Sequence, residues 1–221
     1  QARVPLTTGL LIGIGETREE RLLSLLALRD LHAEHGHLQE IILQNFVPKA
    51  GTKMAEVPAP PFEELLWTIA MARHVFGAAM SLQAPPNLNT GRLEAIIAAG
   101  CNDWGGVSPV TVDHVNPESP WPQLDSLAAQ TRAAGKTLVP RLTVYPHYIE
   151  KRAEWLHPGI IASVLKHADA SGFARSDDWS PGAGLESPPV ADTPAVSSSR
   201  PATAVVRLME RARAGEALGE D

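Results

Sequence analysis

The fold of this chain is decided by the stretch LTTGLLIGIGETREE, residues 6–20. Its apolar part, residues 6–14, is too short and too rich in glycine for a helix and predicts a buried strand. Thr17 and Glu20 then match a capping box, in which each side chain bonds a free amide at a helix start. Leucines at helical spacing follow, and Gly36 suits a helix end. The stretch therefore predicts one strand–loop–helix unit.

The same pattern recurs three more times before residue 135. A strand is predicted at residues 40–43, ending near Asn45, with a helix that begins at Pro61. A third strand at residues 80–83 precedes a helix capped by Thr90 and closed by Gly100. A fourth strand is predicted at residues 101–107, before a helix that runs from Pro122 to Gly135. Four such units, at about 32 residues each, match the pace of a (β/α) barrel, in which eight units take about 250 residues.

These units predict an α/β fold, the C-terminal half of a TIM-type barrel, with an open doubly wound sheet as the alternative. We assign residues 1–150 to the half barrel and residues 151–179 to its helical tail. Residues 180–201 are rich in Pro, Ser and Ala and predict a disordered linker, because they offer little apolar surface to bury. Residues 202–221 regain a helical pattern and predict the start of a second domain. Since residue 1 is Gln and the apolar strand begins at once, we expect further sequence before it.

Composition excludes several classes of protein. The 221 residues carry a formal net charge of −6, which argues against a nucleic-acid partner. No apolar run reaches the length of about 18 residues that a membrane span needs, so no membrane partner is expected. Cys101 is the only cysteine, so no disulfide can form within the chain, and a reduced cytoplasmic location fits best.

Side chains that follow the strands are the candidates for function, because the carboxyl ends of barrel strands carry the chemistry. After the first strand, glycines let the backbone approach a flat ligand, although a tight turn explains them equally well. The next two loops supply amides that suit a polar heterocycle or a ribityl chain. The loop at residues 102–121 is the densest candidate, because long loops without secondary structure are often functional. The candidate substrate-binding residues are Gln44, Asn45, Gln83, Asn87, Asp103, Trp104, Ser108, Asp113 and Asn116.

Other residues are interpreted as structural. Lys49 is read as solvated, with a role as a charge partner as the alternative, and Cys101 is read as a small buried apolar residue. The spacing of His32, His35 and His37 is not a known metal-ligand pattern, so no metal site is assigned. No nucleophile–base pair is visible, so catalytic residues stay unassigned and an external cofactor is expected to supply the chemistry.

The four loops together resemble those of radical S-adenosylmethionine enzymes, and more narrowly the deazaflavin-forming half of FO synthase in its fused two-domain form. The stretch TTGLLIGIGET resembles the family's adenosine-contacting motif Gly-x-Ile-x-Gly-x-x-Glu. LQNFVPKAGTKM, LQAPPNL and CNDWGGVSPVTVDHVNPESPWP resemble the loops after strands 6, 7 and 8, and RLTVYPHYI the closing segment. The resemblance covers about residues 5–179. The motif falls on Gly9, Leu11, Gly13 and Glu16, with Leu11 in place of Ile.

The resemblance implies a cofactor pair, S-adenosyl-L-methionine and a [4Fe-4S] cluster held by a Cys-x3-Cys-x2-Cys loop. It also implies a small-molecule substrate, a hydroxybenzyl–ribityl-diaminouracil adduct that cyclises with loss of ammonia to 7,8-didemethyl-8-hydroxy-5-deazariboflavin. This chain departs from the family in having only Cys101. The expected partners are therefore a preceding half barrel that holds the cluster and a second radical domain, and the chain alone is expected to be inactive. The alternatives are a radical enzyme of menaquinone or biotin type, or a non-catalytic chain that docks a cluster-bearing partner.

Overall fold

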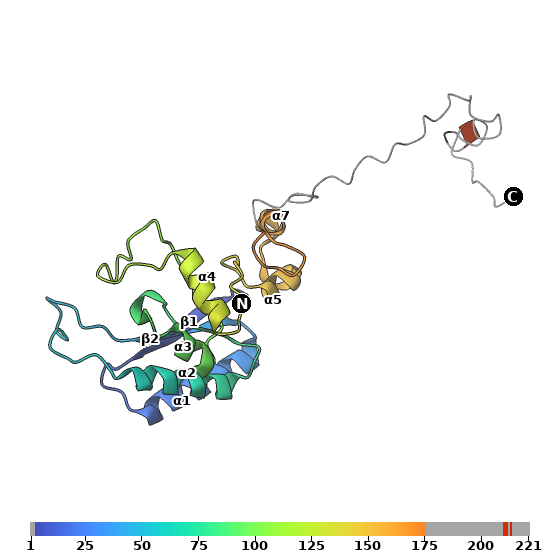
Figure 1. Cartoon of the computed structure of the whole chain (residues 1–221). Coiled ribbons are helices and arrows are strands. Elements are labelled where there is room, and N and C mark those ends of the chain that lie inside the picture. Colours follow the sequence, from blue (N-terminus) through green and yellow to red (C-terminus); the bar gives the residue numbers. More distant parts are fainter. Residues whose placement is uncertain (1–2, 176–209, 212, 214–221) are drawn as a thin grey trace, which may run out of the picture. The chain divides into compact units, whose positions relative to one another are not determined.

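The computed structural model describes residues 3–175, 210–211 and 213 (Figure 1). Strands and helices alternate through the first part of this range: β1 (Leu6–Ile12), α1 (Arg18–His35), β2 (Leu38–Asn45), α2 (Phe62–Phe76), β3 (Ser81–Gln83), the 3-10 helix η1 (Asn87–Asn89), α3 (Leu93–Ala99) and α4 (Leu124–Ala133). Three short helices follow, namely α5 (Pro146–Glu150), α6 (Arg152–Trp155) and α7 (Pro158–His167).

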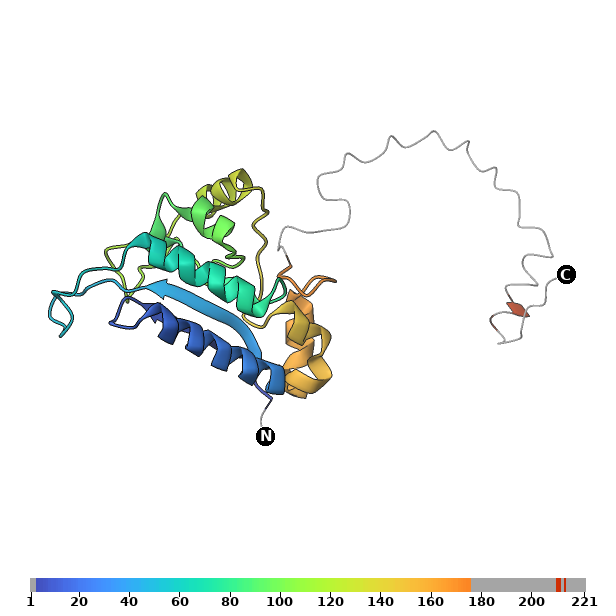
Figure 2. The same cartoon turned by 90° about the horizontal axis from the view of Figure 1, so that it is seen from below.

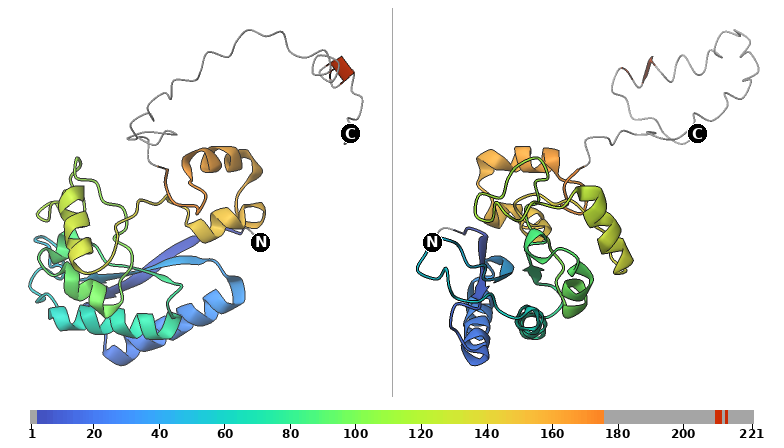
Figure 3. Two further views of the ribbon diagram at one scale, coloured as in Figure 1. Left: turned by 45° about the vertical axis from the view of Figure 1, so that its right-hand side comes forward. Right: turned by 60° about the vertical axis from the view of Figure 1, so that its left-hand side comes forward.

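The sheet is parallel, and its strand order follows the chain, β1-β2-β3. Leu10 pairs with Leu43, and Ile42 pairs with Gln83, so all three strands end at the same edge. Each helix from α1 to α4 contacts the next one along the chain (Figures 1 and 3). The result is a singly wound arrangement in which strands and helices advance together in one direction.

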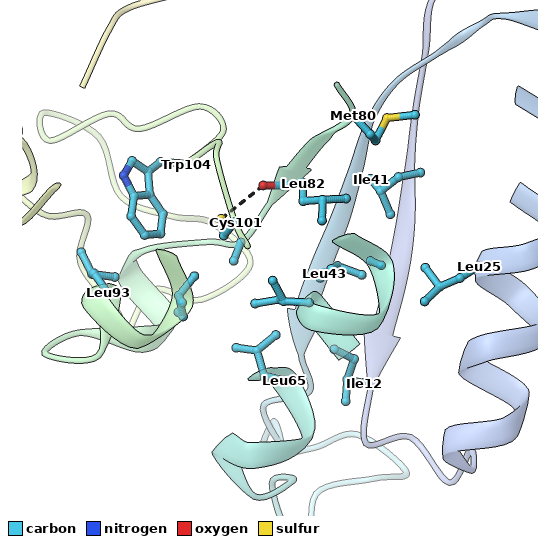
Figure 4. Close-up of a cluster of buried hydrophobic side chains, with 14 of the residues drawn as sticks. Ile12, Leu25, Ile41, Leu43, Leu65, Met80, Leu82, Leu93, Cys101 and Trp104 are labelled. Carbon is cyan, nitrogen blue, oxygen red and sulfur yellow. Dashed lines mark hydrogen bonds between the residues drawn. The ribbon is translucent and has the colours of Figure 1, made fainter. Parts of the chain in front are cut away.

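The hydrophobic core lies between the sheet and this row of helices (Figure 4). Every second residue of a strand reaches it, because alternate side chains point to opposite faces of a sheet. The helices complete it with leucines and isoleucines at spacings of three and four. Its fully buried leucines and isoleucines are Ile12, Leu25, Ile41, Leu43, Leu65, Ile69, Leu82 and Ile96.

The first predicted unit is confirmed in detail. Thr17 caps α1 by accepting from the amide of Glu20, and the Glu20 carboxylate accepts from the amide of Thr17. Gly36 ends the helix in the left-handed conformation, as Gly100 does for α3. The strand stops at Ile12 rather than at residue 14, because Gly13 turns the chain at a φ of 94°.

The fourth predicted strand is wrong. Residues 101–107 make only an isolated parallel bridge, between Gln83 and Asp103. The amide of Asp103 still reaches Leu82 O, but the chain then turns at Gly105, whose amide donates to the Asp103 carboxylate at 2.6 Å. Pairing therefore starts and is broken within two residues.

Smaller differences concern helix starts and the closing segment. Thr90 does not cap α3, because it ends η1, and Arg92 stands at the helix start. Pro61 and Pro122 precede α2 and α4 rather than lie in their first turns. The closing segment, RLTVYPHYI at residues 141–149, enters helix α5 at Pro146.

The C-terminal predictions fall largely outside the described residues. The linker at residues 180–201 lies wholly outside them. Within residues 202–221, only Glu210, Arg211 and Arg213 are described, all with helical backbone (Figure 2). Among the residues that the structure describes, no helix has both the length and the apolarity to cross a membrane.

Candidate functional site

The sheet face away from the core carries part of the predicted site. By alternation and register this face holds Thr7, Gly9 and Leu11 of β1, with their partners Glu40, Ile42 and Gln44 of β2. The hydroxyl of Thr7 donates to the Glu40 carboxylate at 2.8 Å, which confirms that the two side chains share a face. We call it the polar face.

The glycines of the first motif have packing reasons. A Cβ on Gly9 would lie 2.1 Å from the backbone oxygen of Ile42, so this glycine lets β1 approach β2 closely. A Cβ on Gly13 would lie 2.6 Å from the ring of Pro60, and its positive φ favours glycine in any case. The sequence left a ligand approach and a tight turn open, and these contacts favour the structural explanation for both glycines. Leu11 is 42% exposed and free to touch a ligand.

Glu16 closes the turn after β1. Its carboxylate accepts from the amides of Gly13 and Ile14, both at 2.8 Å, and contacts Arg21 at 3.0 Å. Burial alone would raise the pKa of Glu16, but these amides and the guanidinium of Arg21 hold it below its usual value. Its charge is therefore neutralised by partners within eight residues: the two turn amides and Arg21 of α1. We call residues 13–16 the Glu16 turn.

Amide side chains gather where β2 and β3 end. Asn89 donates to the side-chain oxygen of Asn45 at 3.1 Å, and Gln44 lies beside it at the end of β2. Asn87 is buried and donates to Asp113 at 2.9 Å, while its own side-chain oxygen has no partner. The structure thus brings four predicted residues from three segments of the chain to one edge: Gln44, Asn45, Asn87 and Asp113.

The loop at residues 102–121 folds on internal hydrogen bonds. Asp113 accepts from the amides of Val115 and Asn116 and from the side chain of Asn116. Burial would raise the pKa of Asp113, but these donors hold it below its usual value. Lys49 is not simply solvated, because it pairs with Glu118 of this loop. Ser108 is half-buried, and its carbonyl accepts from Thr111 within the loop.

Trp104 occupies a different place from the predicted one. It is 8% exposed and belongs to the hydrophobic core, where its indole nitrogen donates to Thr131 of α4 at 3.1 Å. Figure 4 shows its ring beside Leu93 and Cys101 on the helix side of the sheet. Trp104 therefore packs in the core on the helix side of the sheet, away from the polar face.

A group of hydrogen-bonded polar residues, of which the sequence singled out only Asp103, gathers at the polar face. Arg141 donates two hydrogen bonds to the Asp103 carboxylate, from Nε at 2.7 Å and from Nη2 at 3.0 Å. Its Nη2 also donates to the Glu40 carboxylate at 3.3 Å. The hydroxyl of Tyr145 lies 2.6 Å from the Glu40 carboxylate and 2.8 Å from that of Asp103. The guanidinium of Arg141 also stacks over the Tyr145 ring, 4.1 Å from its centre. We call these four residues the Arg141 cluster.

Electrostatics explains why the cluster holds together. Burial and the carboxylate of Asp103 raise the pKa of Tyr145 well above its ordinary value, so the phenol keeps its proton. Burial alone would lower the pKa of Arg141, but the same carboxylate raises it. The only sequence signals were a charged residue in a buried strand and an Arg and a Tyr in the closing segment. They were missed because the bonds join residues far apart in sequence.

The described residues do not fit an iron–sulfur cluster. Cys101 is buried, its sulfur lies 3.2 Å from both Leu82 O and Asp103 O, and burial raises its pKa to about 11 (Figure 4). Its reading as a small buried residue is confirmed. No group of three or more His, Cys, Asp or Glu within the described ranges is arranged to hold a metal ion. We therefore derive no step through such a cluster.

Comparisons with known proteins agree with the resemblance seen in the sequence. The chain is 52% identical over 174 residues to FO synthase of Mycobacterium tuberculosis, and 50% identical over 178 residues to FO synthase of Streptomyces coelicolor. These matches cover 78% and 80% of this chain but 20% of either relative. No family model and no solved structure matches the chain.

An archaeal relative extends the comparison. The chain is 46% identical over 175 residues to the 7,8-didemethyl-8-hydroxy-5-deazariboflavin synthase of Methanopyrus kandleri. This match covers 79% of the chain and 52% of that enzyme. The chain thus spans about a fifth of the length of the bacterial relatives and about half of the archaeal one. At these levels of identity, most of this chain is homologous to one segment of FO synthases.

Proposed function

We propose that this chain forms the C-terminal half of a radical S-adenosylmethionine barrel that makes a deazaflavin. Two observations support the barrel: the strand order β1-β2-β3 follows the chain, and the helices advance beside one another. A doubly wound sheet reverses its order at a switch point, and the described strands show no reversal. The homology to FO synthases supports the reaction.

The substrate proposed for the whole protein is a hydroxybenzyl–ribityl-diaminouracil adduct, which cyclises with release of ammonia. The observation that carries this proposal is the edge where β2 and β3 end, because it presents neutral amides from separate loops. Amides donate and accept at once, which suits the uracil ring and the ribityl hydroxyls. Gln44, Asn45, Gln83 and Asn87 are the side chains that we propose to contact the substrate.

S-adenosyl-L-methionine, when bound, supplies the 5′-deoxyadenosyl radical that starts the reaction. We propose that its adenosine lies along β1, beside Gly9 and the exposed Leu11. Gly13 and Glu16 are proposed to act indirectly, because the bonds from the Gly13 amide and from Arg21 fix the shape of the turn.

A chimera tests the proposed function. Residues 3–175 would replace the homologous segment of the Mycobacterium tuberculosis FO synthase, and deazaflavin and 5′-deoxyadenosine would be measured together by chromatography. We expect both products. A folded chimera that forms 5′-deoxyadenosine but no deazaflavin would contradict the proposed substrate, and one that forms neither would contradict the proposed barrel segment.

A further inference from the structure

We propose that Arg141 and Tyr145 are positioning residues that hold the turn at residues 103–106, and through it Gln83, on the polar face. The inference deepens the proposed function, since Gln83 is one of the proposed substrate contacts. The structural part of the inference rests on the contacts of the cluster alone.

Of the two positioning residues, Arg141 contributes more to fixing Asp103, because its positive charge compensates the carboxylates of both Asp103 and Glu40. The side chains of Glu40 and Asp103 are 8% and 10% exposed, and both approach the hydroxyl of Tyr145. A phenol has one proton to donate, so it cannot satisfy both acceptors. Without Arg141, two negative charges would face each other with little water between them, and breaking a buried pair in this way is strongly destabilising.

The position of the Asp103 carboxylate fixes the turn at residues 103–106 through a hydrogen bond from the Gly105 amide. One oxygen of its carboxylate accepts from the Gly105 amide at 2.6 Å as well as from Arg141 at 3.0 Å. Gly105 has a φ of 71°, and a Cβ there would lie 2.2 Å from the side-chain nitrogen of Gln83. The Gln83 amide therefore rests against the backbone of this turn. A shift of Asp103 moves the surface against which Gln83 packs.

The remaining contacts of the cluster are also internal. Glu40 accepts from the hydroxyl of Thr7, and Nη1 of Arg141 donates to Leu142 O at 3.2 Å. The polar atoms of Arg141 thus serve neighbouring parts of the chain, which indicates a role in positioning rather than contact with a substrate. Arg141 and Tyr145 lie 38 and 42 residues beyond Asp103, so the cluster joins the closing segment to the sheet.

Hydrogen exchange of the full 221-residue chain tests the proposal. Exchange of the Gly105 amide would be followed at pH 8. In Arg141→Met we expect protection to fall by roughly tenfold or more, because Glu40 and Asp103 lose the cation that lies between them.

Two further variants separate charge compensation from loss of packing. Arg141→Met combined with Asp103→Asn removes one charge of each sign, so we expect more protection at pH 8 than in Arg141→Met alone. Arg29→Met is the matched control, because Arg29 makes an exposed ion pair with Asp30. Its exchange at Gly105 should equal that of the parent chain.

The proposal is overturned by either of two results. The first is exchange at Gly105 in Arg141→Met that equals exchange in the parent chain. The second is protection that is lost in Arg141→Met and does not return in the double variant. Neither result depends on catalysis, so failure of the chimera to form deazaflavin would contradict the proposed function and leave the exchange result decisive.

Discussion

Two turns of this protein are built with the same device but braced over different distances. In the Glu16 turn and in the turn at residues 103–106, a carboxylate accepts from backbone amides of its own glycine turn and pairs with an arginine. Arg21 lies five residues beyond Glu16, whereas Arg141 lies 38 residues beyond Asp103. The first turn is therefore stabilised locally, and the second depends on the closing segment reaching the sheet.

The largest difference between the two turns is expected in the free energy of unfolding when the carboxylate of each turn is removed. Asp103→Ala removes both short bonds of the Arg141 guanidinium, leaves it with the longer 3.3 Å contact with the Glu40 carboxylate, and deprives Gly105 of its acceptor, so we expect a loss of about 3–5 kcal/mol in the free energy of unfolding. Glu16→Ala should cost only about 1–2 kcal/mol, because Arg21 keeps Glu64 and Thr68 as partners. Urea denaturation measures both. Equal losses would contradict the distinction between a local and a long-range brace.

The glycine of the first turn can be probed separately. Gly13→Ala forces a Cβ against the Pro60 ring at a positive φ, and we expect a loss of about 2–4 kcal/mol. Gly15→Ala is the matched control, because Gly15 also has a positive φ but nothing within 4 Å of the added carbon. Its cost should be about 1–2 kcal/mol, from backbone strain alone. If the two variants unfold at the same urea concentration, the requirement for glycine at position 13 does not come from packing against Pro60.

Removing the Tyr145 hydroxyl, which contacts Asp103, should change the free energy of unfolding by a smaller amount. Tyr145→Phe removes a hydroxyl that lies against two carboxylates, and we expect a loss of about 1–3 kcal/mol. Tyr148→Phe is the control, since that hydroxyl makes one bond, to Gly36 O. The same denaturation experiment compares them. A larger effect at Tyr148 would contradict the central place of Tyr145 in the cluster.

Acid should weaken the ion pairs beside the Glu16 turn, in which Arg21 contacts both Glu16 and Glu64 of α2. Hydrogen bonds from Arg18 and Arg21 lower the pKa of Glu64 to about 2, and the pKa of Glu16 is also lowered. A carboxylate with a lowered pKa stabilises the fold above its unfolded value of about 4.5, and this stability is lost as the pH falls toward 2. We expect the urea midpoint of the parent chain to fall over this range, and that of Glu64→Gln to fall less. Parallel curves would contradict this origin.

The sequence predicted what is local and missed what is distant. The capping box, the first three strands and the glycine helix ends follow from residues within a few positions of each other, and the structure confirms them. The fourth strand failed because the bond between Asp103 and Gly105 turns the chain, and this bond depends on Arg141. Trp104 was assigned to the substrate site rather than to the core, because its hydrogen bond to Thr131 of α4 cannot be read from its neighbours in sequence. The sequence did predict that amides meet at the edge of the sheet, because parallel strands end together.

The most direct test of the account uses Asn45→Ala in the chimera, measured as deazaflavin formed per 5′-deoxyadenosine. Asn45 ends β2 at the amide edge, away from the Arg141 cluster, so its loss should leave the fold and radical formation intact. We predict that the ratio of the two products falls several-fold. A ratio equal to that of the unsubstituted chimera, in a protein that is folded and still forms 5′-deoxyadenosine, would contradict the proposal that this edge faces the substrate.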